Sequence, residues 1–466
     1  MSIKNNVHYR TICTMAFFGT DGIRGKFGEF PVNRHGISLL ALAIISQIGD
    51  NRDKPIVICK DTRESSDKIE EMLSTAFSSN GIKVIQIGIL PTNATSIAIE
   101  HFQASFAIMI TASHNLYYDN GVKIFDSNGK KLADDIKRRI EEFILGNVEN
   151  RMISYNGDHS YIFKYDFSDK YLRYLVNYIE IDLKLPQLSP VKHKANILFD
   201  CANGATSFLM EKISRILGDC FNVLYINHCP NGRNINDQCG SMHLGSAQEY
   251  MTENNIDLAF SFDGDGDRVI ILLSDGKIID GDKILAFLCE HLLSLHKIDR
   301  ITVTRMSNSA LSEFLLRKYD IQCIETDIGD QNISNILQNN NDILLGGENS
   351  GHILLRGIAS SDSILVSVLI LYILNNSEIE ANNLMQKFDL YNEYLRIEQS
   401  ITLSADSNYI ERINEIESML ANYQDSITKK VVRKSGTEPK IRIMIESKHH
   451  NILCEINQLL INLFNT

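Results

Sequence analysis

Three aspartates alternate with glycines in the segment Asp263-Gly264-Asp265-Gly266-Asp267. Glycine lets the backbone turn tightly enough for the three carboxylates to point toward one place. Carboxylates this close repel one another unless a cation lies between them, and hard oxygen ligands favour Mg²⁺, Ca²⁺ or Mn²⁺. An EF-hand loop needs Gly at its sixth position and Glu at its twelfth, where this chain has Arg268 and Ser274. The segment therefore predicts a divalent-cation site of another kind, with a solvated acidic turn as the alternative.

A serine follows the apolar, strand-like run at residues 106–110. Ser113 is followed by His114, Asn115 and, further along, Lys123. Open α/β sheets bind their ligands beyond the ends of strands, so Ser113 is a candidate nucleophile. The segment has no Gly-x-Ser-x-Gly turn, which argues against the acyl-transfer Ser-His pair of an α/β hydrolase. The alternative is that Ser113 and His114 only cap a helix.

A basic turn lies near the C-terminus of the chain. It carries, in order, Arg433, Ser435, Gly436, Thr437 and Arg442. Guanidinium groups, hydroxyls and the backbone N–H groups that a glycine exposes together suit a phosphate. The chain as a whole is acidic, with a formal net charge of −12, so this concentration of positive charge is exceptional. We expect a phosphate site here, with a basic edge strand that prevents aggregation as the alternative.

Two glycine-punctuated turns supply further polar side chains. Glu348, Ser350 and His352 follow the apolar run 343–345, and their carboxylate, hydroxyl and imidazole suit the hydroxyl groups of a sugar. Near the N-terminus, the turn at residues 18–25 carries Arg24, whose charge suits a phosphoryl group. This turn has no Walker Gly-Lys-Ser/Thr sequence, so a nucleotide P-loop is not expected. Ordinary solvated turns are the alternative in both places.

Apolar strands must hold these loops in place. The runs at residues 106–110, 257–262 and 343–345 each end directly in one polar loop, and stretches with helical spacing separate the strand-like runs. This alternation predicts α/β domains with largely parallel sheets. The three loops then form either one site per domain or a single site on which all converge. The part after about residue 383 has no such loop and is expected to form a smaller fourth domain.

Composition limits the classes of protein that fit. A chain of 466 residues accommodates about three domains of ~150 residues, and 44% hydrophobic with 22% charged residues is typical of a globular protein. The net charge of −12 argues against binding to nucleic acid or an anionic membrane surface. The longest apolar run, residues 364–374, is shorter than the ~20 residues of a membrane-spanning helix and predicts a buried helix. Nine cysteines without a C-x-x-C pair, and no apolar leader in residues 1–14, favour reduced thiols and a cytoplasmic location.

Taken together, the five motifs resemble those of the α-D-phosphohexomutases, in the same order and over residues 17–446. The segments 200–205 and 231–240 are similar to the branch of that family that acts on glucosamine phosphate. The resemblance implies an α/β fold with three α/β sandwich domains with mixed sheets and a C-terminal α+β domain around a central cleft. It also implies a phosphoserine domain (1–160), a metal-binding domain (161–279), a sugar-binding domain (280–380) and a phosphate-binding domain (381–466).

The resemblance also gives each candidate residue a role. The metal site would consist of phosphorylated Ser113 with Asp263, Asp265 and Asp267, around Mg²⁺. The sugar would contact Glu348, Ser350 and His352, and the distal phosphate would contact Arg433, Ser435, Gly436, Thr437 and Arg442. The phosphoryl group in transit would be surrounded by Arg24, His114, Lys123 and Arg268, with Lys123 as the first candidate for the base and His114 as the second.

The implied reaction interconverts glucosamine 6-phosphate and glucosamine 1-phosphate through a bound 1,6-bisphosphate, in the supply of UDP-N-acetylglucosamine for the cell wall. Glucosamine or glucose 1,6-bisphosphate would first phosphorylate the enzyme, with Mg²⁺ as cofactor. The partner would be the phosphosugar, and a homodimer is one option for the assembly. A phosphoserine adds about −1.5 to −2 charges, so with three aspartates the site would hold roughly −5 and require a divalent cation.

Three positions depart from the family pattern. Leu116 stands where the family usually has proline, which predicts a less rigid loop. Asn349 matches neither the glutamine usual in the glucosamine branch nor the methionine common in enzymes of mannose and glucose phosphates, and Gln331 stands where the glucosamine branch usually has arginine. A mutase of neutral hexose phosphates is therefore the alternative within the family. A phosphatase and a phosphosugar-binding sensor are the alternatives outside it, although a sensor needs no nucleophile.

Overall fold

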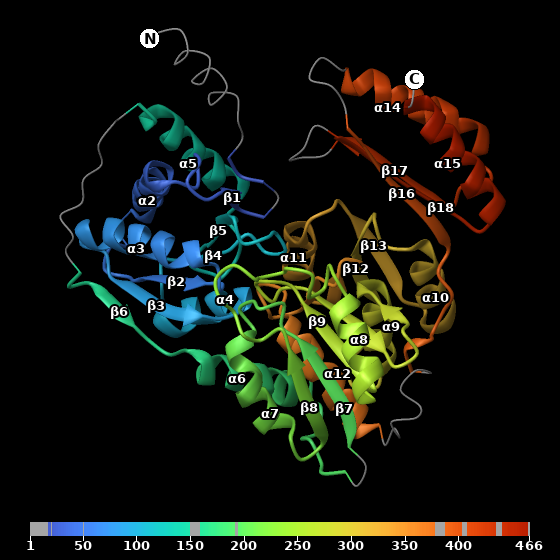
Figure 1. Cartoon of the computed structure of the whole chain (residues 1–466), viewed down its shortest axis with the longest axis horizontal. Coiled ribbons are helices and arrows are strands. Elements are labelled where there is room, and N and C mark those ends of the chain that lie inside the picture. The colour runs from blue at the N-terminus through green and yellow to red at the C-terminus, as the bar shows by residue number, and fades with distance from the viewer. Residues whose placement is uncertain are drawn as a thin grey trace.

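The computed structural model describes residues 17–19, 21–49, 51–149, 159–191, 194–377, 387–402, 408–434 and 440–464. These residues form four separate sheets that follow one another along the chain (Figure 1). None of the helices described is both long and apolar enough to span a bilayer.

The first sheet has six strands in the order β1-β5-β4-β2-β3-β6. These are β1 (Ile23–Lys26), β2 (Ile56–Lys60), β3 (Val84–Ile89), β4 (Phe106–Ile110), β5 (Asp119–Phe125) and β6 (Ile162–Lys164). The helices of this part are α2 (Arg34–Ile48), α3 (Glu64–Ser79), α4 (Thr92–Phe102) and α5 (Asp134–Asn147). Along β2, Ile56 and Ile58 pack with α2, α3 and α5, while Val57 and Cys59 pack with α4, so helices cover both faces of the sheet.

The second sheet has five strands in the order β11-β10-β9-β7-β8. These are β7 (Ala195–Asp200), β8 (Phe221–Ile226), β9 (Leu258–Phe262), β10 (Val269–Leu273) and β11 (Ile278–Ile279). The helical segments before and within it are α6 (Ser168–Asn177), η1 (Tyr178–Asp182), η2 (Ser207–Leu209), α7 (Met210–Leu217) and α8 (Gly245–Asn254). On β7, Ile197 packs in the cluster that contains α7 and Leu198 in the cluster that contains α8, so this sheet is also covered on both faces.

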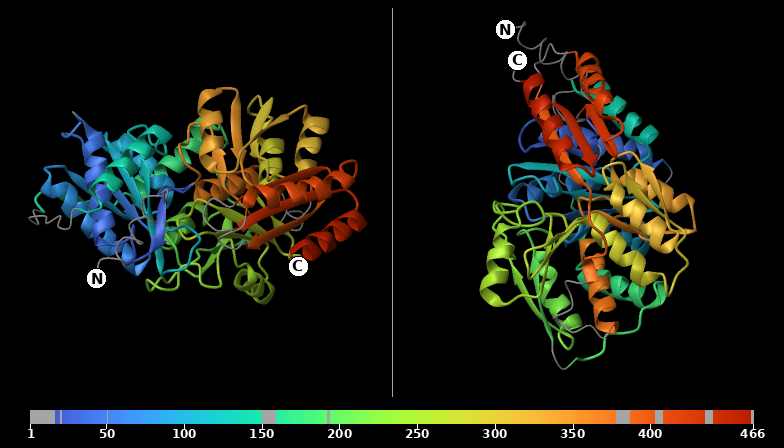
Figure 2. Two further views of the ribbon diagram at one scale, coloured as in Figure 1. Left: turned by 90° about the horizontal axis from the view of Figure 1, so that it is seen from above. Right: turned by 90° about the vertical axis from the view of Figure 1, so that its right-hand side faces the viewer.

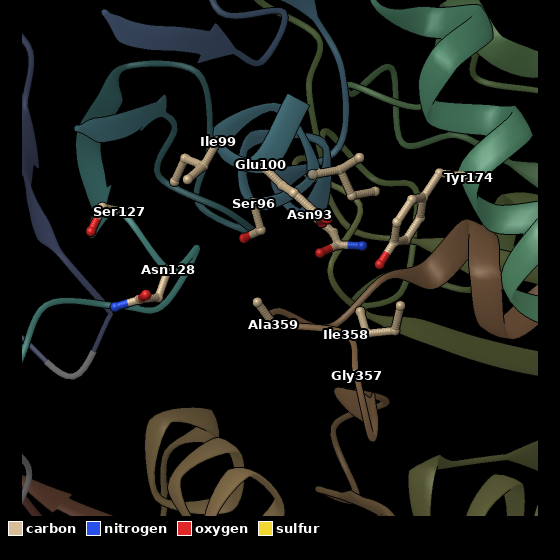
Figure 3. Close-up of a pocket in the computed structure, with 11 residues that line it drawn as sticks. Asn93, Ser96, Ile99, Glu100, Ser127, Asn128, Tyr174, Gly357, Ile358 and Ala359 are labelled. Atoms are coloured by element: carbon tan, nitrogen blue, oxygen red, sulfur yellow. The ribbon is translucent and has the colours of Figure 1, made fainter. Parts of the chain in front are cut away.

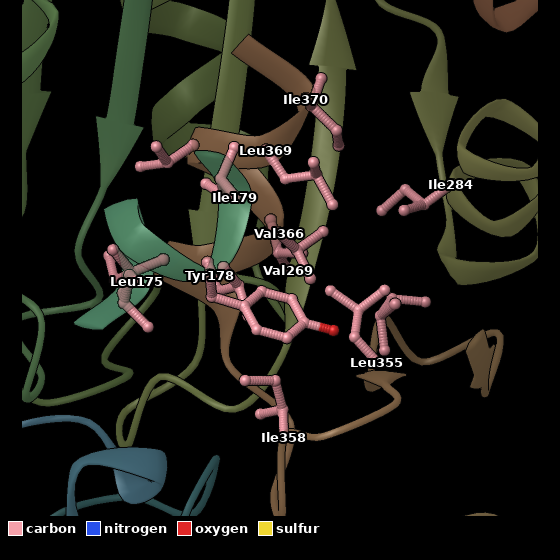
Figure 4. Packing of buried hydrophobic residues seen from close by; sticks show 14 of the residues in the cluster. Leu175, Tyr178, Ile179, Val269, Ile284, Leu355, Ile358, Val366, Leu369 and Ile370 are labelled. Atoms are coloured by element: carbon pink, nitrogen blue, oxygen red, sulfur yellow. The ribbon is translucent and has the colours of Figure 1, made fainter. Parts of the chain in front are cut away.

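The third sheet has four strands in the order β13-β12-β14-β15. These are β12 (Arg300–Thr304), β13 (Gln322–Thr326), β14 (Ile343–Gly347) and β15 (Ile353–Leu355), with α9 (Gly281–Leu292), α10 (Ser309–Tyr319), α11 (Asp330–Asn339) and α12 (Ser363–Asn376). The long apolar run forms α12, which is buried from residue 363 to 374, as predicted. Figure 4 shows Val366, Leu369 and Ile370 of α12 packed among Ile179, Val269 and other apolar side chains of the second and third parts.

The C-terminal sheet has three antiparallel strands in the order β16-β18-β17. The strands are β16 (Leu395–Thr402), β17 (Lys429–Lys434) and β18 (Lys440–Ser447), and the helical segments are α14 (Tyr409–Leu420), η4 (Ala421–Tyr423) and α15 (His450–Phe464). Both α14 and α15 contribute to a hydrophobic cluster with β18. Figure 2 shows this part at one end of the molecule, at the opposite end from α2 and α3.

The predicted α/β class with mixed sheets is confirmed, but the residue pattern alone predicted largely parallel sheets, and this was wrong in one respect. Each of the three polar loops turns the chain back, so that β4 pairs antiparallel with β5, β9 with β10, and β14 with β15. Burial of both faces gives these strands continuous apolar sequences whatever their direction. Their direction therefore cannot be read from hydrophobicity.

Candidate active site

The Ser113 loop (residues 111–119) meets the acidic loop (residues 263–268). The Oγ of buried Ser113 donates a hydrogen bond to Oδ2 of Asp263 over 2.8 Å. The Nδ1 atom of His114 lies 3.4 Å from the same hydroxyl. The backbone of Ser113 has a φ of +52°, in the left-handed region, and its N–H donates to Oγ1 of Thr111. The candidate nucleophile and the acidic loop therefore face each other, although they come from different sheets.

The carboxylates of Asp263, Asp265 and Asp267 form one compact, buried group. Each offers an oxygen within 4.8 Å of oxygens of the other two. The turn is closed internally, since the N–H groups of Asp267 and Arg268 both donate to Oδ1 of Asp263 over 3.1 Å. Burial raises the pKa of Asp263 well above its usual value, and the charges of Asp267 and Asp265 raise it further. Such crowding is unfavourable unless positive charge is supplied.

Residues outside the acidic loop fix its shape. At the start of α4, Thr92 donates through Oγ1 to Oδ2 of Asp265 over 2.7 Å, and through its N–H to the carbonyl of Asp265 over 2.9 Å. Ser361 Oγ donates to the carbonyl of Asp267 over 2.7 Å. Ser363, the first residue of α12, donates to the carbonyl of Gly266 through its N–H and its Oγ. The first and third parts of the chain thus support a loop that belongs to the second.

Two oxygens of the acidic loop suit a metal ion. Oδ1 of Asp265 and Oδ1 of Asp267 are buried and accept no hydrogen bond from any residue that the structure describes. A buried carboxylate oxygen without a partner is costly, so this arrangement fits a cation. Because every donor is a hard oxygen, the cation it fits best is Mg²⁺ or a similar ion.

Lys123 supplies positive charge to the same place. It lies on β5, is 2% exposed, and its Nζ lies 2.7 Å from Oδ2 of Asp265, 2.6 Å from Oδ2 of Asp267 and 2.9 Å from Oδ2 of Asp21. Burial alone would lower the pKa of Lys123, but the three carboxylates raise it well above its usual value. In this arrangement the ammonium is charged and holds the acidic loop against β5.

Two arginines and a histidine complete the polar surroundings of Ser113. Arg24 forms an ion pair with Asp21. Burial would lower the pKa of Arg268, but the charges of Asp267 and Asp263 raise it above its usual value. Burial lowers the pKa of His114 to about 4, and the charges of Arg268 and Arg24 act in the same direction. The imidazole is therefore neutral near pH 7 and has a lone pair that can accept a proton.

The third loop borders this group. Glu348 follows β14, and its Oε1 accepts a hydrogen bond from the N–H of Gly329 over 2.9 Å. Ser350 Oγ lies 3.3 Å from Oε2 of Glu348, to which it donates. The negative charge of Glu348 is among those that raise the pKa of Arg268, which places this loop beside the acidic loop.

His352, in the same loop as Glu348 and Ser350, lies between two aspartates. It is 3% exposed, with Nε2 3.0 Å from Oδ2 of Asp330 and Nδ1 3.7 Å from Oδ1 of Asp267. Burial would lower its pKa, but Asp267 and Asp330 raise it. In the structure the imidazole connects the acidic loop with α11, and its expected contact with a sugar stays a prediction.

The first and third parts also meet through polar side chains. Lys131 forms ion pairs with Asp21 and with Asp330. Next to Asp330, Gln331 accepts a hydrogen bond from Nζ of Lys137 over 2.6 Å and donates to the carbonyl of Leu132 over 3.1 Å. Gln331, which departs from the family pattern, therefore lies in this contact. Its amide oxygen can accept a hydrogen bond from Lys137, whereas an arginine at this position would repel that lysine.

The basic residues of the C-terminal sheet gather near the end of the third sheet. Arg433 on β17 and Arg442 on β18 are paired across the ladder. Burial, followed by the positive charges of Arg442 and Arg305, lowers the pKa of Arg433. Arg305 directly follows β12 and forms an ion pair with Asp327. The other predicted phosphate ligands, Ser435, Gly436 and Thr437, lie outside the described residues.

Several residues of the site received no role from sequence alone: Asp21, Thr92, Lys131 and Asp330. Asp21 stands in the same glycine-punctuated turn as Arg24, and Asp330 stands beside Gln331, so each is close in sequence to a residue that its type or position singles out. Their importance rests on ion pairs with lysines far away in the sequence. Only the folded chain shows these pairs.

A separate cavity of about 260 Å³ lies between α4, the turn at residues 127–128 and the turn at residues 357–359 (Figure 3). It is lined by Asn93, Ser96, Glu100, Tyr174 and Ile358, among others. Asn93 in its wall follows Thr92, which bonds to Asp265 of the acidic loop. None of the predicted site residues lines it.

Comparisons with known proteins agree along the chain. Family models described as phosphoglucomutase/phosphomannomutase alpha/beta/alpha domains I, II and III match residues 15–151, 169–276 and 280–391. A phosphoglucosamine mutase of Ruthia magnifica is 33% identical over 454 residues, which cover 96% of this chain and 99% of that protein. A phosphoglucosamine mutase of Buchnera aphidicola is 36% identical, with 97% of each chain covered.

Solved structures show the same fold at lower identity. A phosphoglucomutase/phosphomannomutase family protein from Burkholderia thailandensis has a TM-score of 0.75 at 19% identity, covering 94% of this chain and 95% of that one. The N-acetylphosphoglucosamine mutase of Aspergillus fumigatus, solved with GlcNAc-6P and magnesium, has a TM-score of 0.63 at 14% identity, covering 99% of each chain.

Proposed function

Because this chain belongs to the α-D-phosphohexomutase family and is similar over nearly its whole length to phosphoglucosamine mutases, we propose that it interconverts glucosamine 6-phosphate and glucosamine 1-phosphate. It is an enzyme of the isomerase class that moves a phosphoryl group within one sugar. The observation that carries the assignment at the level of the site is the hydrogen bond from Ser113 Oγ to Asp263, beside two orphaned carboxylate oxygens.

In the proposed mechanism, Ser113 carries the phosphoryl group. The bond from phosphorus to Oγ breaks as a bond forms to a hydroxyl oxygen of the bound sugar phosphate, whose proton passes to a base. The 1,6-bisphosphate that results then reorients in the site, so that its other phosphate faces Ser113. Its other phosphoryl group then returns to Ser113, and the proton returns to the sugar oxygen that is left. The cycle thus ends with the phosphate on the other carbon and the serine phosphorylated again.

The charged residues around Ser113 supply what this transfer requires. Asp263, Asp265 and Asp267 would hold Mg²⁺, which when bound neutralises charge on the phosphate oxygens. Lys123, Arg24 and Arg268 orient and balance the transferring group. Lys123 stays our first candidate for the base, and it must lose its proton against the three carboxylates that now raise its pKa. His114 stays the second, with a neutral imidazole 3.4 Å from Ser113 Oγ.

The remaining predicted residues would bind the rest of the substrate. Glu348 and Ser350 are proposed to contact sugar hydroxyls, together with His352. Arg433 and Arg442, with residues 435–437, are proposed to bind the phosphate that is not transferring. We propose the same four domains as above, with the bounds at residues 279 and 380 kept and the first bound moved from 160 to a point after β6, which pairs with β3 in the first sheet. A separate phosphate-binding domain suits a bisphosphate that must bind in two orientations.

Three finer points belong to the same proposal. Glucosamine or glucose 1,6-bisphosphate first phosphorylates Ser113, since the cycle begins only with a phosphorylated enzyme. The cytoplasm is the protein's proposed location. A homodimer is its proposed assembly.

The test is a comparison of kcat/KM for glucosamine 6-phosphate with the values for glucose and mannose phosphates, in the presence of Mg²⁺ and a bisphosphate. We expect glucosamine 6-phosphate to be preferred. A preference for a neutral sugar would replace the assignment by a mutase of neutral hexose phosphates. Asn349 is compatible with that outcome, because it matches the pattern of neither branch. Steady release of inorganic phosphate without an isomer would indicate a phosphatase, and binding without either reaction would indicate a sensor.

A further inference from the structure

The Ser113 loop bends so that several of its carbonyl groups point to one side. Four of them accept hydrogen bonds from a single side chain, Arg63. Its Nη2 donates to the carbonyls of Ser113 and Asn115 over 2.9 and 2.8 Å, and its Nη1 donates to those of Leu116 and Asp119. Buried carbonyl groups need donors, and one guanidinium here serves four of them.

The guanidinium of Arg63 has no hydrogen to spare. Its Nε donates to Oδ2 of Asp61 over 2.8 Å, so every N–H group of the side chain is used. Arg63 and Asp61 are each 1% exposed. Asp61 also accepts from Oγ of Ser66 over 2.9 Å. The pair is neutral as a whole, so it contributes shape to the loop rather than net charge.

The fold places Arg63 directly beside the Ser113 loop. Asp61 and Arg63 stand between β2 and α3, and β2 pairs in parallel with β4, so that Lys60 is opposite Ile110. The strand that precedes Ser113, β4, and the strand that precedes Arg63, β2, therefore end side by side. From the second part of the chain, Nδ2 of Asn236 donates to the same two carbonyls, those of Ser113 and Asn115, over 2.9 and 3.0 Å.

We infer that Arg63 is the positioning residue that fixes the Ser113 hydroxyl for phosphoryl transfer, an inference that rests on the proposed role of Ser113. The left-handed backbone of Ser113 is unfavourable for a residue with a side chain and needs support from its surroundings. The carbonyl bonds to Arg63 and Asn236 provide that support. They also explain how the loop keeps its shape with Leu116, since the bond to the Leu116 carbonyl does not depend on a proline ring.

The test is the variant Arg63→Lys. Lysine keeps the positive charge opposite Asp61, but its single nitrogen cannot serve four carbonyls at once. We expect kcat to fall about 10²-fold, as displacements of about 1 Å do, with KM for glucosamine 6-phosphate little changed. Hydrogen exchange in the peptide that covers residues 111–119 should become faster, and the melting temperature should fall, because buried carbonyls lose their donors. A purely structural role would reduce activity only by the fraction unfolded at the assay temperature, whereas a positioning role lowers kcat of the folded enzyme.

Arg233→Lys is the matched control. Arg233 is an exposed arginine whose Nε lies 2.7 Å from Oε2 of Glu64, the residue after Arg63, and its replacement should leave both kcat and exchange unchanged. Asn236→Ala should lower kcat about tenfold and add little in an Arg63→Lys background, because both side chains bond to the same carbonyls.

A folded Arg63→Lys enzyme with kcat within about twofold of the wild type and unchanged exchange in residues 111–119 would overturn the inference. If Arg63→Lys does not fold, Asn236→Ala decides, and an unchanged kcat in that variant overturns it. Absence of mutase activity in the wild type would refute the proposed function instead. The exchange measurement would still report whether Arg63 holds the loop.

Discussion

The Ser113 loop and the basic strands β17 and β18 are attached to the rest of the molecule in different ways. Side chains from all three of the first sheets converge on the Ser113 loop and the acidic loop, through Arg63, Asn236, Thr92 and Ser363. These contacts are buried, and most of them involve backbone carbonyls of the two loops. The Ser113 loop and the acidic loop, where we propose that the phosphoryl group is transferred, therefore lie in the interior, and packing sets their geometry.

Among the residues that the structure describes, the C-terminal sheet is attached to the third part through the joining loop (residues 306–309) and through ion pairs of Lys429 with Glu325 and of Lys448 with Glu313. Arg396 donates to the carbonyl of Met306 and Lys429 to the carbonyl of Ser307, over 3.1 and 2.9 Å. Asn308 exchanges hydrogen bonds with the backbone of Tyr394, and Ser309 Oγ donates to Glu446 over 2.8 Å. None of these partners belongs to the Ser113 loop or the acidic loop.

The difference matches two requirements of the proposed reaction. Phosphoryl transfer needs fixed distances, whereas a bisphosphate that turns over needs a phosphate-binding part that can release it and bind it again. A sheet that has its own hydrophobic cluster and contacts the third part through polar side chains suits the second requirement. The following variants test whether the two regions are as different as their attachments indicate.

The largest effect is expected from Ser113→Ala. Without the hydroxyl no phosphoryl group is carried, so mutase turnover should fall by about 10³-fold or more, and intact mass should show no phosphate after treatment with glucose 1,6-bisphosphate. Ser105→Ala is the control, because Ser105 is a buried serine of the same part whose Oγ bonds to the carbonyl of Pro55. Substantial turnover by Ser113→Ala would refute the phosphoserine.

The next effect is expected from Asp265→Asn. Asparagine keeps the size of the side chain but removes one of the charges around the orphaned oxygens, so kcat should fall about 10²-fold and the Mg²⁺ concentration for half-maximal activity should rise. Asp257→Asn, at a carboxylate that accepts from the N–H of Asn196 over 2.8 Å, is the control. Full wild-type activity in excess chelator would contradict the metal site.

A smaller and different effect is expected from Arg433→Gln in the C-terminal sheet. If the arginine contacts only the phosphate that is not transferring, KM should rise about 10- to 100-fold, which is the value of one or two charge-assisted hydrogen bonds, with a smaller change in kcat. Arg412→Gln on α14, where the arginine pairs with Glu415 over 2.7 Å, is the control. A fall in kcat with unchanged KM would indicate that Arg433 acts on the phosphoryl group being transferred. The C-terminal sheet would then not differ in role from the Ser113 loop and the acidic loop.

The smallest effect is expected at Asp282, beside the joining loop. Its Oδ2 accepts from the N–H of Asn308 over 2.7 Å, and burial, followed by the charge of Asp280, raises its pKa to about 7. The folded state therefore binds a proton that the unfolded state has lost above about pH 4, so stability should decrease as pH rises from 4 to 7. Asp282→Asn should flatten this dependence, by a few degrees in melting temperature between pH 5 and 8. An unchanged slope would show that another group is responsible.

The parts of the site that could be predicted from sequence are those that are local in the chain. Residue type and spacing single out the acidic loop and Ser113, which the structure brings together. The same reasoning singles out Arg433 and Arg442, whose contact with a phosphate stays a prediction. The contacts of Arg63 could not be predicted in this way, because an arginine after a strand has no pattern that shows it turning back to carbonyls some 50 residues away. The same holds for Asp330, whose partners lie in other sheets.

The two serines that hold the acidic loop have a consequence for synthesis of the protein. Ser361 and Ser363 lie 94 and 97 residues beyond the carbonyls they bond to, so the loop leaves the ribosome long before its supports. Until α12 docks, three crowded carboxylates lack the frame that makes them a cation site. The complete set of bonds around the acidic loop therefore forms only after the chain has been made as far as α12.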